Sequence, residues 1–180
     1  KFMHSFYDFP DPSGWKYQIK NAFALNANAS YLHYFKKISS NKLDISSYNF
    51  LKTGTVFTSI STGIYSRIGF KNLEPFSNSV AFHSNLNKNS TSNKESFIFV
   101  KPMIHYTLYD ATIEGSFLNN TSPVTFDVMP FHFSIELGYR YYRKRFLYGY
   151  TYTYHTQKLK SLKAPKTNSY GSIYIGYYFN

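Results

Sequence analysis

The sequence contains no cysteine, so neither a disulfide framework nor thiolate chemistry is available to it. It also lacks any apolar run that approaches the roughly 20 residues needed by a membrane-spanning helix. Charged residues make up only 16% of the chain, and acidic residues are the scarcer kind, with 9 Asp and Glu against 20 Lys and Arg. The resulting net charge of +11 favours anionic partners, either nucleic acid or a phosphorylated lipid surface.

Aromatic residues, in contrast, are abundant. They form 21% of the chain, with 19 Tyr and 18 Phe. A soluble core seldom needs so many tyrosines, because each buried hydroxyl requires a partner. Tyr, Phe, Ile and Thr favour strands, and helix-forming residues are not concentrated in any window. The composition therefore predicts an all-β protein, and a membrane β-barrel accommodates it because barrel strands alternate lipid-facing and lumen-facing residues.

Alternation of apolar and polar residues predicts about seven long strands within one domain, residues 1–180. We expect an antiparallel β-barrel in meander order, with Tyr, Phe and Ile facing outward. Residues 71–94 are rich in Asn and Ser and lack periodicity, so they are predicted to be a long loop, and residues 111–125 an irregular connection. The predicted strands are residues 15–35, 43–57, 59–70, 95–110, 126–142, 144–160 and 169–179.

Basic residues gather at the predicted turns. They do so at residues 36–37, 143–145 and 158–166. A platform for single-stranded nucleic acid would instead interleave bases and aromatics over one surface. Basic turns between long aromatic strands fit the rims of a barrel, so we expect lipid phosphates rather than nucleic acid as the anionic partner.

One polar loop, residues 3–21, is a candidate for chemistry. His4 can exchange a proton near neutral pH, as a general base must. Asp8 and Asp11 are close enough in sequence to orient this imidazole or to help hold a cation. The alternative is an ordinary surface loop with a solvated histidine. Elsewhere the sequence shows no phosphate-binding glycine loop, no serine elbow and no histidine pair at metal-ligand spacing.

The other histidines are scattered along the predicted strands and loops. We expect them to be rim or lumen side chains rather than metal ligands. An ion pair between Arg67 and Glu136 inside the lumen is one interpretation of these two residues, and the favoured alternative is that each is simply a polar residue that faces inward. The histidines in question are His33, His83, His105, His132 and His155.

Several short motifs follow one another along nearly the full length of the chain. They are His4, the block Gly14-Trp15-Lys16-Tyr17-Gln18-Ile19-Lys20-Asn21, Gly54 with Thr58, Gly63, Arg67-Ile68-Gly69, the segment from Asp110 to Gly115, and Thr156 to Lys160. Their order resembles that of the outer-membrane lipid A 3′-O-deacylases of the LpxR type.

This resemblance implies a twelve-stranded barrel in the bacterial outer membrane. It also implies calcium-dependent hydrolysis of the ester that holds the 3′-linked acyloxyacyl group of lipid A, so that lipopolysaccharide and outer membrane lipids would be the partners. His4 matches the family histidine that activates water. Calcium would polarise the ester carbonyl, and no covalent nucleophile would be needed.

The sequence also departs from the family pattern. Pro10 occupies the place of the family's acidic partner, so we expect Asp8 or Asp11 to replace it as a catalytic residue beside His4. The family's amino-terminal strands have no counterpart here, and they would carry the main calcium ligands. We therefore expect the carboxy-terminal part of a larger barrel, inactive by itself. The alternative is a non-enzymatic outer-membrane barrel, structural or pore-like.

Overall fold

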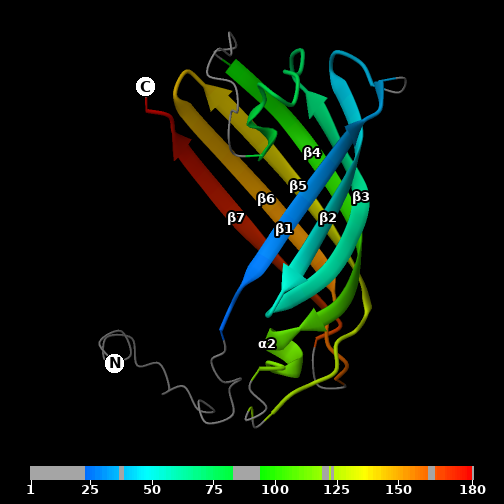
Figure 1. Cartoon of the computed structure of the whole chain (residues 1–180). Helices are drawn as coiled ribbons and strands as arrows, with labels where there is room; N and C mark the ends of the chain where they lie inside the picture. Colours follow the sequence, from blue (N-terminus) through cyan, green and yellow to red (C-terminus); the bar gives the residue numbers. More distant parts are fainter. Residues whose placement is uncertain are drawn as a thin grey trace.

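The computed structural model describes residues 23–36, 39–82, 94–118, 122, 124–161 and 165–179. Seven strands form one antiparallel sheet, and each strand pairs with its neighbours along the chain (Figure 1). The strands are β1 (Asn26–Tyr34), β2 (Leu43–Gly54), β3 (Phe57–Gly69), β4 (Lys94–Asp110), β5 (Phe131–Arg143), β6 (Phe146–Thr156) and β7 (Thr167–Tyr177). The predicted all-β meander and its number of strands are confirmed.

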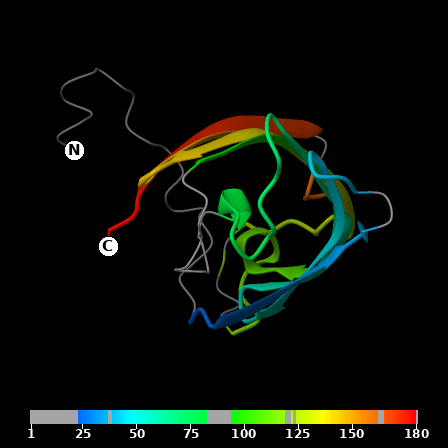
Figure 2. The same ribbon diagram turned by 90° about the horizontal axis from the view of Figure 1, so that it is seen from above.

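The sheet curls into a curved wall, which Figure 2 shows from above. Within the described part of the chain, β1 and β7 each pair on one side only, so the wall is an open barrel with two free edges. The convex face and the concave face carry alternate residues of every strand, as the period of two requires.

Side chains on the convex face are mostly apolar and exposed. In β7, for example, Ile173 and Ile175 are 79% and 69% exposed, whereas their neighbour Tyr174 points inward and is partly covered. The convex face of the other strands follows the same rule and includes Ile60, Ile64, Ile68, Ile98, Ile104, Leu108, Phe131, Tyr148 and Tyr150. The prediction of outward Tyr, Phe and Ile is therefore confirmed.

Most strand ends differ from the predictions by a few residues. The first strand begins at Asn26 rather than at residue 15, and residues 15–22 of that prediction lie outside the described residues. The predicted second strand extends to Phe57, but residues 55–56 form a tight turn and Phe57 already belongs to β3. The connection after β4 begins with a short helix, α2 (Ala111–Glu114), because the Asp110 carboxylate caps it by accepting from the Thr112 backbone N–H at 2.9 Å. No described helix has the length and apolar character needed to cross a membrane.

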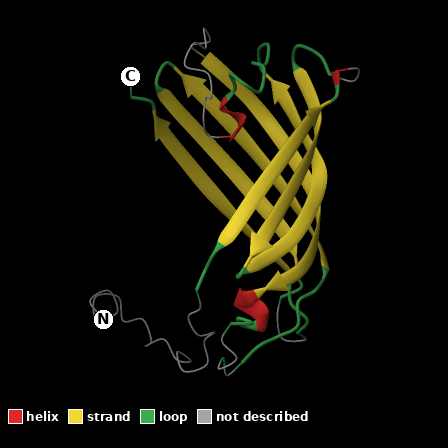
Figure 3. Cartoon of the chain, viewed as in Figure 1, coloured by secondary structure: helices red, strands yellow, loops and turns green. Residues whose placement is uncertain are grey.

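The connection after β3 folds back inside the wall at the end opposite α2 (Figures 1 and 3). We call residues 71–82 the plug segment. Its short 3-10 helix η3 (Val80–Phe82) buries Val80 completely, in a cluster with inward side chains of the wall. The wall residues of this cluster are Tyr65, Phe97, Phe99 and Leu147. Residues 71–82 are therefore not a loose loop, since they fill one end of the lumen.

A buried arginine fastens the plug segment to the wall. Arg67 is fully buried and forms ion pairs with Asp44 and Glu95. The Glu95 carboxylate in turn accepts hydrogen bonds from the Ser79 hydroxyl and the Val80 backbone N–H, each at 2.9 Å. We call Arg67, Asp44, Glu95 and Ser79 the Arg67 cluster.

Arg67 and Glu136 do not pair with each other. The strand register decides the outcome, because Asp44 lies directly opposite Arg67 across β2 and β3. Glu136 lies opposite Lys101 across β4 and β5, and these two side chains form their own ion pair at 2.8 Å. Both residues do face the lumen, as the alternation predicts, but each is satisfied by a nearer partner.

Candidate functional site

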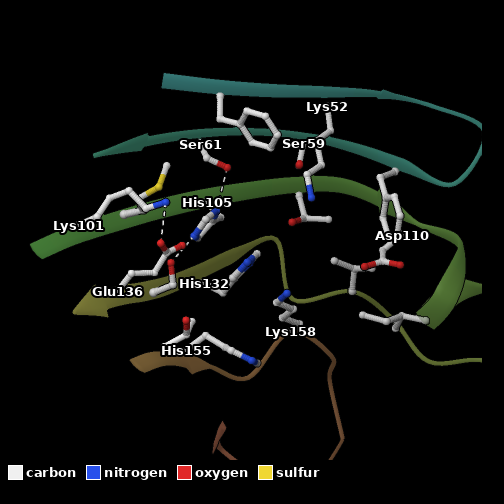
Figure 4. Close-up of a pocket in the computed structure, with 18 of the residues that line it drawn as sticks. Lys52, Ser59, Ser61, Lys101, His105, Asp110, His132, Glu136, His155 and Lys158 are labelled. Atoms are coloured by element: carbon white, nitrogen blue, oxygen red, sulfur yellow. Dashed lines mark hydrogen bonds and ion pairs between the residues drawn. The ribbon is translucent and has the colours of Figure 1, made fainter. Parts of the chain in front are cut away.

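The half of the lumen that the plug segment leaves open is a cavity of about 330 Å³. We call it the lumenal pocket. Inward side chains from β2 to β7 line it, together with residues of the connections at the α2 end (Figure 4). Its basic residues are Lys52, Lys101, His105, His132, His155 and Lys158. These residues come from five separate parts of the chain, which only the meander brings together.

His105 is held rigidly at the centre of this pocket. Its Nδ1 lies 2.7 Å from the Ser61 hydroxyl, and its Nε2 lies 2.7 Å from the Ser134 hydroxyl. One hydroxyl must donate and the other accept when the imidazole is neutral. Because both ring nitrogens are engaged, His105 joins β3, β4 and β5.

His132 lies directly opposite His105 in the β4–β5 pair. The two rings stack with centroids 4.5 Å apart and planes 9° apart. Unlike His105, His132 keeps its Nδ1 buried without a hydrogen-bond partner among the described residues. A buried polar atom of this kind calls for a partner, and His132 is one of the imidazoles that line the pocket.

The carboxylates that line the pocket are already engaged. Glu136 pairs with Lys101, and Asp110 caps α2 through its side chain. Lys52 and Lys158 have no carboxylate within ion-pair distance in the described part of the chain. The Lys52 ammonium instead lies 5.4 Å from the centroids of both the Phe50 and Phe57 rings. The pocket therefore presents positive charge to whatever enters it.

The described residues do not fit the calcium that the family resemblance implies. Calcium takes about six to eight oxygen ligands, mostly from carboxylates and carbonyls. Among the described residues, no group of three or more His, Asp or Glu side chains could hold a metal ion. With Glu136 and Asp110 committed elsewhere, a calcium site would need carboxylates from other parts of the protein.

The predicted catalytic residues His4, Asp8 and Asp11 lie outside the described residues. The chain approaches β1 at the α2 end, where the Leu25 backbone N–H donates to the Thr55 hydroxyl at 2.9 Å. This entry to β1 lies at the same end of the sheet as α2 (Figure 1).

Four of the other histidines lie in the described part of the chain. His105, His132 and His155 line the lumen, and His33 lies near the end of β1 on the convex face. His83 lies outside the described residues. Alternation predicted the inward direction of the lumenal histidines, but no sequence spacing indicated that His105 and His132 would meet.

Comparisons with known proteins agree with this architecture. The model of a protein family described as outer membrane protein LpxR matches residues 1–179. Among solved structures, LpxR from Salmonella typhimurium is similar, with a TM-score of 0.72 and 15% sequence identity. That match covers 99% of this chain and 60% of the Salmonella chain. A comparison with curated proteins gave no match.

Proposed function

The chain belongs to the family of the outer membrane protein LpxR, and we propose that it serves in the hydrolytic removal of the 3′-linked acyloxyacyl group from lipid A. The observation that carries this proposal is the family match over residues 1–179. The fold supports it, since an outer membrane protein with an apolar convex face and a pocket open at one end can reach a membrane lipid from within the bilayer.

The lumenal pocket supports recognition of a phosphorylated sugar. Lipid A carries phosphate groups on its sugars, and the pocket offers Lys52 and Lys158 without carboxylate partners. His132 adds a buried ring nitrogen that has no partner in the described part of the chain. We assign to these three side chains the binding of the lipid A head group.

The chemical step belongs, in this proposal, to residues of the loop before β1. His4 takes a proton from the attacking water, and Asp8 or Asp11 orients the imidazole by accepting from its other nitrogen. This arrangement needs no serine or cysteine nucleophile, in agreement with the absence of cysteine from the sequence.

Calcium dependence is a further part of the proposal. Since the described residues do not supply a calcium site, its ligands would come from Asp8 or Asp11 and from other residues outside the described ranges. We also expect the chain to act only as part of a complete barrel, because β1 and β7 each pair on one side only in the described part of the chain. Addition of a chelator to the full-length protein, followed by restoration with calcium, tests this requirement.

The alternative of an open pore is disfavoured by one observation. The plug segment occupies one end of the lumen, with Val80 fully buried and the Arg67 cluster beneath it. A lumen filled in this way offers a pocket rather than a channel. A barrel without enzymatic activity remains the other outcome of the following test.

Mass spectrometry of lipid A from cells that express the full-length protein tests the proposal. We expect the natural protein to remove the 3′-linked acyl group and His4→Ala to leave it in place. His33→Ala is the matched control, since this histidine lies on the convex face of β1 and should leave activity unchanged. Equal loss from all three proteins would exclude the role of His4, and retention by all three would indicate a barrel without this activity.

A further inference from the structure

A second hollow lies on the convex face of the sheet, at the end opposite the mouth of the lumenal pocket. It has a volume of about 460 Å³ and surrounds the turn between β5 and β6. Three consecutive cations, Arg143, Lys144 and Arg145, line it together with the aromatic rings of Tyr148 and Tyr177. We call it the hairpin hollow. None of its residues belongs to the lumenal pocket, so it requires an explanation of its own.

The cations of the hairpin hollow are not neutralised by the protein. Among the described residues, no carboxylate lies within ion-pair distance of Arg143, Lys144 or Arg145. Arg143 lies directly opposite Lys94 in the β4–β5 pair, and the Lys94 ammonium lies 5.8 Å from the centroid of the Tyr141 ring, which also lines the hollow. An anion bound in the hollow would find three cations beside it.

The backbone conformation of the turn also draws attention to Lys144. Lys144 has a φ of +58°, a left-handed conformation that glycine, asparagine or aspartate adopts with less strain in a two-residue hairpin. The chain nevertheless has lysine there, at some cost to the stability of the turn. The lysine thus places a positive charge at the hollow in spite of this backbone strain.

Aromatic rings form the walls of the hollow and extend from it along the convex face. Phe146 packs edge-on against Tyr177 with centroids 5.0 Å apart. Tyr148, Tyr150 and Tyr152 then follow one another along β6, all outward and 44%, 49% and 39% exposed. Amphipathic rings of this kind are typical of the border between the hydrocarbon core and the lipid head groups.

We propose that the hairpin hollow binds an anionic glycerophospholipid. Its phosphate lies among Arg143, Lys144 and Arg145, where the planar guanidinium groups can donate two hydrogen bonds each. One acyl chain lies along the tyrosines of β6. A cluster of basic residues beside a membrane surface attracts anionic lipids by charge, and the aromatic walls add contact area.

The choice of a glycerophospholipid rests on the proposed function. Strands β5 and β6 have 13 and 11 residues, enough to cross the bilayer when tilted. The two ends of the sheet therefore lie at opposite membrane surfaces. If the lumenal pocket meets lipid A at one surface, the hairpin hollow faces the other leaflet, which in an outer membrane consists of glycerophospholipids.

Native mass spectrometry of the full-length protein in detergent tests this proposal without any hydrolysis. The probes are phosphatidylglycerol, the zwitterionic phosphatidylcholine and lipid A. We expect phosphatidylglycerol to bind more tightly than phosphatidylcholine. Each cation removed should weaken its binding about 5-fold, so Arg143→Gln with Arg145→Gln should lose about 25-fold.

Two further variants separate charge from folding. Lys144→Gly should bind phosphatidylglycerol about 5-fold more weakly, because it removes one cation. Its turn should be no less stable, because glycine adopts a positive φ freely. Lys71→Gln removes an exposed cation at the same end of the sheet but outside the hollow, and should bind like the natural protein. Circular dichroism of each variant confirms that it is folded.

The outcomes are distinct. Equal binding of phosphatidylglycerol and phosphatidylcholine, or unchanged binding in the Arg143→Gln/Arg145→Gln protein, would overturn the proposal. Tighter binding of lipid A than of phosphatidylglycerol at these arginines would overturn it as well, because it would reverse the assignment of the leaflets. A protein that binds phosphatidylglycerol here but leaves lipid A intact would refute the proposed hydrolysis alone.

Discussion

The guanidinium carbon of Arg67 lies 3.9 Å from the centre of the Phe76 ring. Arg67 belongs to the wall of the barrel and Phe76 to the plug segment, so this contact joins two parts of the chain that the strand pairings leave separate. A cation over an aromatic face is attracted by the negative potential of the ring. Together with the ion pairs to Asp44 and Glu95, it makes Arg67 the central residue of the closed end.

Loss of the Arg67 charge should destabilise the barrel strongly. In Arg67→Gln, the carboxylates of Asp44 and Glu95 stay buried without their cation, and breaking a buried ion pair in this way costs about 3–5 kcal/mol. Urea unfolding in detergent, followed by circular dichroism, measures the change. Lys101→Gln is the control, because the side chains of Lys101 and Glu136 are 17% and 30% exposed and such a pair contributes about 1 kcal/mol or less. Equal losses in the two variants would contradict the special role of Arg67.

The natural protein should not conduct ions. The plug segment fills one end of the lumen with apolar side chains, and Val80 is fully buried there. Planar bilayer recordings of the full-length protein should therefore show no steady conductance. Arg67→Gln, which releases the plug segment from the wall, should show intermittent openings. A large, constant conductance of the natural protein would contradict the closed lumen described here.

Two glycines on opposite faces of the sheet should respond differently to alanine. A methyl group on Gly138 would overlap the Phe99 ring and lie 2.7 Å from the Tyr150 carbonyl oxygen, inside the packed end of the lumen. Overpacking of this kind costs about 1–3 kcal/mol. In Gly171→Ala, the new methyl group would meet the Tyr150 hydroxyl at 2.9 Å, the far end of a side chain that can move aside. Thermal unfolding should thus show a clear loss for the first variant and little change for the second.

Lys52 should contribute to substrate binding rather than to the chemical step. In Lys52→Gln, the lumenal pocket loses one of its unpaired cations, and KM for lipid A should rise about 5-fold while kcat changes little. Lys160→Gln removes an exposed cation at the same end of the sheet that does not line the pocket, so its kinetics should match the natural protein. A fall in kcat without a change in KM would assign Lys52 to the reaction itself.

The strands could be predicted from the sequence because alternation is a local signal. In β7, the outward Ile173 and Ile175 and the inward Tyr174 can be recognised without reference to any other strand. The register between strands is not local, so the sequence could not decide which carboxylates pair with Arg67. A shift of a few residues between neighbouring strands changes every cross-strand partner, and nothing within a single strand encodes that shift.

The arrangement of the residues that line the lumenal pocket was harder to predict for the same reason. His105 and His132 lie in different strands, and their stacking depends on the β4–β5 register alone. The sequence of the plug segment shows no hydrophobic periodicity, because its only helix, among the described residues, is the three-residue η3. Its burial also depends on a hydrogen bond from the Val80 backbone N–H to the Glu95 carboxylate, which is distant in the sequence. The hairpin hollow is the exception, because its three consecutive cations were visible in the sequence as a basic turn.

The meander has a consequence for how the sheet can form. Every described strand pairs only with its neighbours in sequence, and turns of two residues join β2 to β3 and β5 to β6. The entropy lost on closing each hairpin depends on the length of its connection, so these two short turns make their hairpins the least costly to close. A folding chain can begin at either hairpin and add strands outward on both sides, so that the low contact order of the meander favours rapid assembly at the membrane.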